Sequence, residues 1–224
     1  MSTKQLALVL AMVGLPVFTA NATLLAPGTG PTNISAETVG PGATLLADTG
    51  TQTVSGSING TTLSVTYSEQ VYSDPNGLCN GCLDFVIQAT NNGSSNTIIN
   101  RVTASNFAGA GGTAQTDVGY NTAVNGGTAL TGAIFPNQGD RQTADVVGFD
   151  FNSTVVNPGQ YTYYLIIRTD QTNYVPGSVS FQDGVTAFGT GFGVAPEPNL
   201  IALMSLAFLG IIGATWRRKK KATE

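Results

Sequence analysis

The sequence contains no histidine, and it contains no lysine between residues 5 and 218. Without histidine the chain cannot operate a Ser-His-Asp or Cys-His mechanism, and it cannot hold zinc through imidazole. Without a central lysine it has no Schiff-base nucleophile and no lysine for an isopeptide staple. We find no other set of side chains that supports a specific reaction, so we expect a non-enzymatic protein without catalytic residues.

Positive charge is scarce between the two ends of the chain. From residue 23 to residue 195 only Arg101, Arg141 and Arg168 are basic, against eleven Asp and Glu, which leaves a net charge of −8. Such a surface repels phosphate backbones, so we expect no nucleic-acid partner. The acidity is typical of a soluble surface.

The central part also has few of the residues that favour long helices, and it is rich in Gly, Thr, Ser and Asn. That mixture suits short strands joined by tight turns. We predict an all-β domain, a β-sandwich of Ig-like or jelly-roll style with about seven to nine strands. The expected strands are 43–47, 52–58, 62–72, 83–90, 98–105, 145–151, 161–169 and 178–188.

Turn signals and alternation refine this prediction. Asn59-Gly60 suits the positive φ angles of a type I′ hairpin turn. Leu63, Val65 and Tyr67 alternate as one buried face of a strand would. The glycine-rich stretch 108–139 predicts long loops. We expect an extended lead-in over 23–41, the sandwich over 42–190 and a linker over 191–198.

The only two cysteines, Cys79 and Cys82, are three residues apart. In an exported chain such a pair predicts a disulfide. A redox Cys-x-x-Cys motif needs a helix N-terminus, and a metal site remains a lesser alternative. The strand-like run 83–87 that follows favours a loop clamped by a structural disulfide.

Residues 1–22 have the three parts of a secretory signal peptide. Lys4 supplies positive charge, residues 6–18 are apolar, and Ala20 and Ala22 are the small residues that signal peptidase accepts before its cleavage site. An N-terminal membrane anchor is the alternative. We expect signal peptidase to be a processing partner and the rest of the chain to cross a membrane.

The C-terminal end combines three features in order. Pro196, Glu197 and Pro198 precede residues 199–216, an uncharged apolar stretch that would span about 27 Å as a helix. A basic run follows within the tail 217–224, and it comprises Arg217, Arg218, Lys219, Lys220 and Lys221. Basic residues resist translocation, so the pattern predicts a transmembrane helix with a cytoplasmic tail.

This tripartite tail resembles the PEP-CTERM sorting signal of bacterial exported proteins. The resemblance covers about residues 194–224 and does not extend to the central domain. It implies recognition by a membrane-embedded, exosortase-like enzyme that cleaves near Pro196-Glu197-Pro198 and directs the protein to the cell surface or extracellular matrix. The two prolines would keep that site extended and accessible to a protease.

Two groups of side chains are candidate ligand sites. Asp140, Asp145 and Asp150 lie in one segment, and residues 73–77 are similar to the start of a calcium loop, but neither has an EF-hand or nonapeptide spacing. Calcium is therefore an open alternative to no cofactor and no metal. A second set could form a sugar-stacking platform, although packing is the favoured role, and it comprises Tyr161, Tyr163, Tyr164 and Tyr174.

Three functional hypotheses follow. The first is a non-enzymatic surface or extracellular-matrix protein, made as an inner-membrane-anchored precursor and then placed at the cell surface or outside the cell, where extracellular polysaccharide is a candidate partner. The second is a carbohydrate- or calcium-binding adhesin module. The third is a hydrolase with paired carboxylates, which finds little support because Glu69 is the only glutamate of the strand-rich region.

Overall fold

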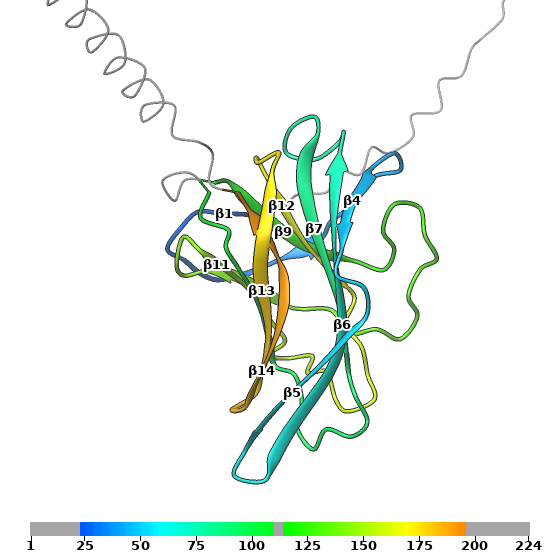
Figure 1. Ribbon diagram of the computed structural model, residues 1–224, viewed down its shortest axis with the longest axis vertical. Helices are drawn as coiled ribbons and strands as arrows, with labels where there is room; N and C mark the ends of the chain where they lie inside the picture. Colours follow the sequence, from blue (N-terminus) through cyan, green and yellow to red (C-terminus); the bar gives the residue numbers. More distant parts are fainter. Residues whose placement is uncertain (1–22, 110–113, 196–224) are drawn as a thin grey trace, which may run out of the picture.

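The computed structural model describes residues 23–109 and 114–195 of the chain. Over this range the protein is all-β, with fourteen strands, no helix, and two sheets that lie face to face (Figure 1). The prediction of an all-β, sandwich-like domain is therefore confirmed. The number of strands exceeds the seven to nine expected, because segments predicted as lead-in and loop also pair with the sheets.

The larger sheet, sheet A, has eight strands. In the order of their pairing, six of them are β1 (Thr23–Leu25), β9 (Thr116–Asn121), β12 (Tyr164–Thr169), β7 (Cys82–Asn91), β6 (Thr61–Asp74) and β4 (Thr44–Asp48). The other two are β3 (Ser35–Ala36), which runs parallel to β9, and β5 (Gln52–Ile58), which is antiparallel to β6.

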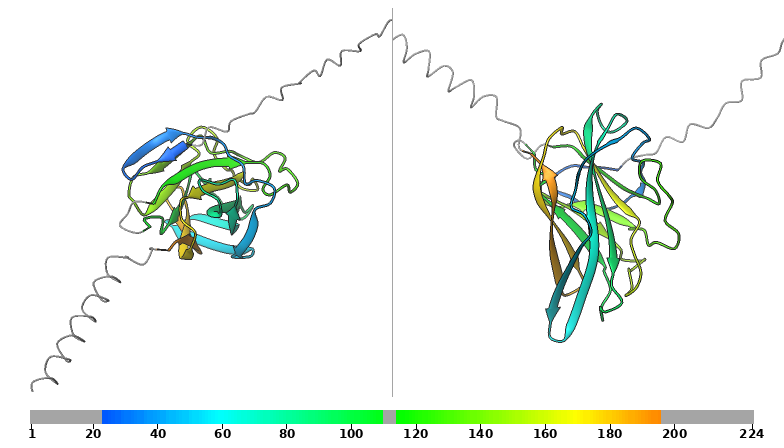
Figure 2. Two further views of the ribbon diagram at one scale, coloured as in Figure 1. Left: turned by 90° about the horizontal axis from the view of Figure 1, so that it is seen from above. Right: turned by 45° about the vertical axis from the view of Figure 1, so that its right-hand side comes forward.

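The smaller sheet, sheet B, has six strands, and all its pairings are antiparallel. In order they are β14 (Thr186–Val194), β13 (Tyr174–Gln182), β8 (Arg101–Ser105), β11 (Val146–Asp150), β10 (Gln138–Arg141) and β2 (Thr29–Asn33). Figure 2 shows β5 and β14 side by side, so the two sheets also meet along one edge.

The main hydrophobic core lies between the sheets and is built by alternating side chains of both. On β6, Leu63, Val65 and Tyr67 point inward and are at most 1% exposed, as their alternation predicted. The ring of Phe181 on β13 lies 5.2 Å from that of Tyr67, which joins sheet B to sheet A. Apolar area removed from water in this way is the main source of the stability of such a domain.

Two hairpins show how turn chemistry sets the topology. Asn59 and Gly60 connect β5 to β6 with φ angles of 49° and 83°, which confirms the predicted type I′ turn. The single strand expected over 178–188 is wrong. The chain turns back at Asp183-Gly184, where Gly184 has a φ of 68°, and the segment divides into β13 and β14.

Three further boundaries differ from the sequence-based expectation. Residues 23–41 are not a simple lead-in, because β1 pairs with β9, β2 with β10 and β3 with β9. The predicted loop 108–139 contains the whole of β9. Residues 191–194, expected as linker, complete β14 and pair with the start of β13. The edge strands β1 to β3 are short and largely exposed, so they lack the alternation that marks a buried strand.

A connection that we call the crossing segment, residues 37–43, covers the outer face of sheet A. It starts beside β9 and ends beside β6, so it passes over β12 and β7. Its Val39 and Ala43 pack on Tyr72, Val86 and Ile166, which together form a second, smaller hydrophobic cluster. The crossing segment thereby covers the part of the outer face of sheet A where Tyr72, Val86 and Ile166 lie.

Within residues 23–109 and 114–195 there is no helix that is long and apolar enough to cross a membrane. The predicted signal peptide 1–22, the transmembrane segment 199–216 and the tail 217–224 lie outside the described residues.

Candidate functional site

The disulfide is the one predicted site that the structure confirms directly. Cys79 and Cys82 are bonded, with their Cα atoms 5.1 Å apart. Cys82 is fully buried and is the first residue of β7, so the bond closes a tight loop just before a central strand. A strand follows the pair, not the helix that a redox motif requires.

The predicted processing residues lie outside the described range. This applies to the signal-cleavage residues Ala20 and Ala22, to the sorting motif Pro196, Glu197 and Pro198, and to the membrane-stop residues Arg217, Arg218, Lys219, Lys220 and Lys221. They remain predictions.

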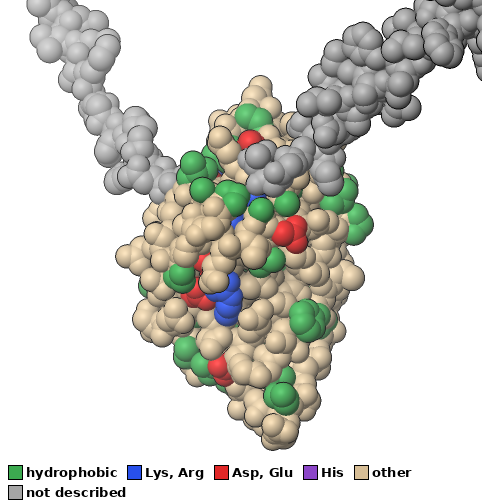
Figure 3. All heavy atoms as spheres, turned by 90° about the vertical axis from the view of Figure 1, so that its left-hand side faces the viewer, with side chains coloured by type: hydrophobic (Ala, Val, Ile, Leu, Met, Phe, Trp, Pro, Cys, Tyr) green, Lys and Arg blue, Asp and Glu red, His purple; other side chains and the backbone are tan. Residues whose placement is uncertain are grey.

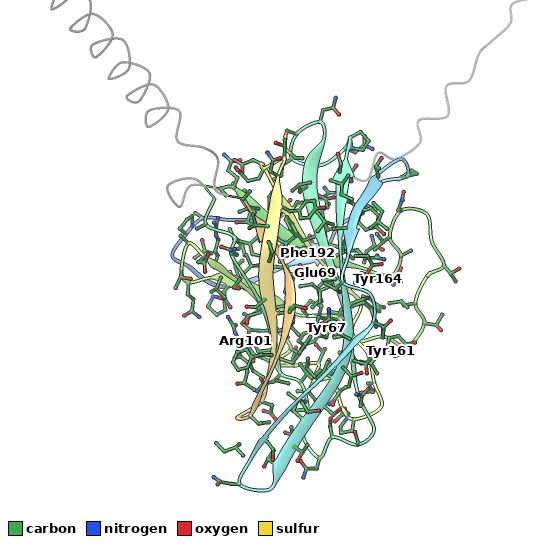
Figure 4. The ribbon with its side chains drawn as sticks, viewed as in Figure 1. Tyr67, Glu69, Arg101, Tyr161, Tyr164 and Phe192 are labelled. Carbon is green, nitrogen blue, oxygen red and sulfur yellow. A yellow bond between two sulfur atoms is a disulfide. The ribbon has the colours of Figure 1, made fainter. Side chains whose placement is uncertain are left out.

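The four tyrosines considered as a sugar platform do not come together. The Tyr163 ring packs near those of Tyr120 and Phe135, with centroids 5.9 and 6.2 Å away. Tyr164 joins the cluster under the crossing segment, and Tyr174 meets Phe192 edge to face. Tyr161 and Tyr164 lie at different levels of the molecule in Figure 4. Packing is thus the role that the structure gives these rings.

The three aspartates considered for calcium are also divided. Arg101 binds Asp140 through two nitrogens, at 2.5 and 3.0 Å, and it binds Asp150 at 2.5 Å. Asp145 is exposed and does not take part. Beside this group lies a pocket of about 200 Å³, which is lined by Arg101, Asp140, Gln142, Thr143 and Val146. Among the described residues, no three acidic or cysteine side chains are arranged to hold a metal ion.

A second group of charges is more unusual, and we call it the carboxyl cluster. It consists of Arg168 and four acidic residues, all buried beneath or beside the crossing segment: Glu37, Asp74, Asp84 and Asp117. In the sequence, Asp74 stood out only as part of a calcium-like loop, and the other three acids did not stand out at all.

Strand register explains why the members of the carboxyl cluster meet. In sheet A, Asp117 on β9 is the direct partner of Arg168 on β12, and Arg168 is the direct partner of Asp84 on β7. These three side chains therefore form one row across three adjacent strands, on the same outer face. Asp74, at the end of β6, and Glu37, at the start of the crossing segment, complete the group.

Arg168 is the cation at the centre of the carboxyl cluster. Its guanidinium nitrogens lie 2.6 Å from Glu37, 3.4 Å from Asp84 and 3.9 Å from Asp74. Asp74 is further held by backbone amides, since the N–H groups of Gly40 and Asn76 donate to its two oxygens at 3.0 and 2.8 Å. Asp74 thus fastens the middle of the crossing segment to the end of β6.

Several carboxyl oxygens in the cluster have no hydrogen-bond partner within the described residues. Both oxygens of Asp117, both oxygens of Asp84 and Oε2 of Glu37 accept no hydrogen bond, although Asp84 Oδ2 lies 3.4 Å from Arg168 Nε. If all four acids were ionised, the cluster would carry a charge of −3 with one arginine to balance it. Burying unpaired charge is costly, so an acid in this position gains by taking up a proton.

The pKa values follow that expectation. Burial raises the pKa of Asp84 to about 8; Arg168 opposes the shift, and Asp74 and Glu37 add to it. Burial also raises the pKa of Asp117 to about 6, with a further contribution from Glu37 and opposition from Arg168. The cluster therefore exchanges protons over a range that includes neutral pH.

One glycine makes this arrangement possible. A Cβ atom at Gly119, on β9, would lie 2.5 Å from the Cβ atom of Glu37 and 2.7 Å from the carbonyl oxygen of Ser35. The missing side chain lets the start of the crossing segment lie directly on the sheet.

Glu69 is a further buried acid, but it lies between the sheets. Figure 4 places it beside Phe192, whose N–H donates to Glu69 Oε2 at 2.9 Å. Its Oε1 has no partner within the described residues, and burial raises its pKa to about 8, with the Phe192 N–H opposing the shift. The hydrogen bond of Glu69 is thus to the backbone of β14, between the two sheets.

The fold thus defines a two-sheet, all-β domain with a buried carboxyl cluster on one outer face and a small polar pocket beside Arg101. Comparison of the chain with protein-family models, with curated proteins and with solved structures gave no match.

Proposed function

We propose that the chain is a non-enzymatic, exported surface or extracellular-matrix protein that is sorted by an exosortase-like enzyme. The observation that carries this proposal is the ordered tail: Pro196-Glu197-Pro198, the apolar stretch 199–216 and the basic run that follows. These features resemble a PEP-CTERM sorting signal, and residues 1–22 resemble a secretory signal peptide.

The described domain is compatible with both processing steps. β1 begins at Thr23, one residue after the proposed signal-cleavage site, and β14 ends at Val194, two residues before Pro196. Cleavage at either end would leave every described strand whole. The disulfide also supports an oxidising, extracytoplasmic location, because such bonds persist there and are rare in the cytosol.

Intact-mass measurement of the protein from its native host tests the proposal. We expect a mature chain that starts at Thr23 and ends near residues 196–198. Replacing Glu197 by Ala should leave the precursor uncleaved at its C-terminus, whereas the matched change Glu224→Ala should not affect cleavage. A mature chain that retains Arg217 to Glu224 would contradict sorting by cleavage.

The polar pocket favours a second candidate, binding of extracellular polysaccharide. Arg101 and Asp140 line the pocket and pair with each other, so the pocket offers both hydrogen-bond donors and acceptors. Its size suits one sugar ring better than a larger ligand. Calorimetric titration of the full chain with a panel of glycans would test this candidate, with Gln142→Ala expected to weaken binding; heat changes unaltered by that substitution would count against the pocket.

A further inference from the structure

We propose that the carboxyl cluster is a proton-binding site that holds the crossing segment on sheet A at acidic pH and releases it progressively as the pH rises. The inference is independent of the sorting proposal, because it concerns only the buried groups of the described domain. Its basis is geometric: four buried acids and one arginine lie at the place where residues 37–43 attach to the sheet.

The negative charge of the cluster can be balanced by a metal ion or by protons. Calcium needs six to eight converging oxygens, and no group of acidic side chains in the described residues has a metal-binding arrangement. The central position is taken by Arg168, which already contacts Glu37, Asp84 and Asp74. Protons on the unpartnered carboxyls therefore complete the balance.

The charged and titratable groups that face the cluster come from five elements. The crossing segment contributes Glu37, β6 contributes Asp74, β7 contributes Asp84, β9 contributes Asp117 and β12 contributes Arg168. On the same face, the nearest tyrosines belong to the apolar cluster, and the Tyr72 hydroxyl donates to Gln70. Asp170, which follows β12 along the chain, accepts instead from the backbone N–H of Gln115 and the side-chain amide of Gln171.

The crossing segment is fastened at both of its ends. Beside β9, the Glu37 N–H donates to the Tyr120 carbonyl, and the Asn125 N–H donates to the Val39 carbonyl at 3.2 Å. Toward β6, the Gly40 N–H donates to Asp74. The side-chain amides of Asn121 and Asn125 also donate to the carbonyls of Glu37 and Ala43. Packing of Val39 and Ala43 and the ionic contact of Glu37 with Arg168 add to these hydrogen bonds. Repulsion between ionised acids acts directly on two of these attachments, those made by Asp74 and Glu37.

The direction of the pH effect follows from linkage. The pKa values of Asp84 and Asp117 are raised in the folded state, so between their unfolded and folded values the attached state binds more protons than the open state. Between about pH 4 and about pH 8, attachment therefore weakens as the pH rises. For each proton released, the open fraction can rise up to about tenfold per pH unit within this range.

Hydrogen exchange read by mass spectrometry tests the proposal on the full chain in a mild detergent, with rates corrected for the intrinsic effect of pH. We expect protection of residues 38–43 to fall by at least about tenfold between pH 5 and pH 8, while protection in the β6–β7 pair changes less. In the variant Asp84→Asn/Asp117→Asn, protection of 38–43 should be nearly the same at both pH values.

Two controls make the result decisive. Glu69→Gln removes an equally buried acid that does not touch the crossing segment, so the pH dependence of residues 38–43 should persist in it. If the double variant does not fold, Asp117→Asn alone should make the change between pH 5 and pH 6 smaller, while the change that Asp84 causes up to about pH 8 should persist. Protection of 38–43 that is independent of pH in the natural chain would overturn the proposal. So would protection at pH 8 that is restored by millimolar calcium and lost with a chelator, since the cluster would then hold a metal.

Discussion

The outer faces of the two sheets each carry buried acids around one arginine, but the two groups differ in how many acids share that arginine. On sheet A the crossing segment covers the carboxyl cluster, and all five charged residues are buried. On sheet B the side chain of Arg101 is 22% exposed and lines a pocket, while its partners Asp140 and Asp150 are buried. Figure 3 shows the side of the molecule next to β11, where acidic and basic side chains adjoin in one small group on a mostly uncharged surface.

The difference shows that the free-energy cost of burying these charges depends on how each acid is paired, and not only on which side chains are present. Arg101 donates to both Asp140 and Asp150 through short contacts, and its own side chain is partly exposed. Arg168 faces four acids with little access to water, and several carboxyl oxygens stay unpartnered within the described range. The third arginine, Arg141, is buried but donates only to backbone carbonyls, including those of Phe107 and Ala114. The carboxyl cluster has the largest imbalance of these groups, with four buried acids for one arginine, and protons can correct it.

The largest expected loss of stability comes from replacing Arg168, the cation beneath the crossing segment. Arg168→Met should lower the free energy of unfolding at pH 7 by about 3–5 kcal/mol, because it leaves buried acids without a positive partner. Arg101→Met is the matched change on sheet B and should cost less, about 1–3 kcal/mol, because it leaves two buried acids without their cation where Arg168→Met leaves four. Urea unfolding followed by circular dichroism measures both. Equal losses would break the comparison between the two faces.

Much of the fold could be predicted from the sequence, because its signals are local. Alternation marked β6, and Asn59-Gly60 marked the β5–β6 turn. The Asp183-Gly184 turn carries a comparable signal, but it was missed because strand-like residues flank it on both sides. The edge strands β1 to β3 could not be recognised, since their pairing partners lie on β9 and β10, far along the chain.

The carboxyl cluster could not be predicted, because it depends on register between distant strands. Nothing local links Glu37 to Arg168, which lie on different elements and meet only once the crossing segment is in place. A weaker signal was present: Asp84 and Arg168 each interrupt an apolar strand, and a charge inside such a run needs a partner. That signal identifies members of the cluster but not the number of acids that share one arginine.

A smaller loss of stability is expected from substituting Gly119, the glycine that lets the crossing segment lie directly on β9. Gly119→Ala should destabilise the domain by about 1–3 kcal/mol, because the new methyl group would press on Glu37 and on the Ser35 carbonyl. Gly30→Ala, in β2, is the control: nothing lies within 4 Å of the place its methyl group would occupy, so it should change stability by less than about 0.5 kcal/mol. Thermal unfolding by calorimetry compares them. A Gly119→Ala protein as stable as the Gly30→Ala protein would mean that the crossing segment can lift from β9 at no cost.

The smallest change in stability is expected from a pair of serines on the outer face of sheet B. The hydroxyls of Ser105 and Ser178 lie 2.7 Å apart across β8 and β13 and are exposed, so water can replace the bond between them. Ser105→Ala/Ser178→Ala should therefore change the free energy of unfolding by less than about 0.5 kcal/mol in urea titrations. On the same face, the hydroxyls of Thr103 and Ser180 form the same kind of pair in a partly buried position. Thr103→Val/Ser180→Ala should therefore lower the free energy of unfolding by more than the change at the exposed pair. If the exposed pair cost as much as the buried one, water would not be reaching this face, and sheet B would have to be covered in solution as sheet A is.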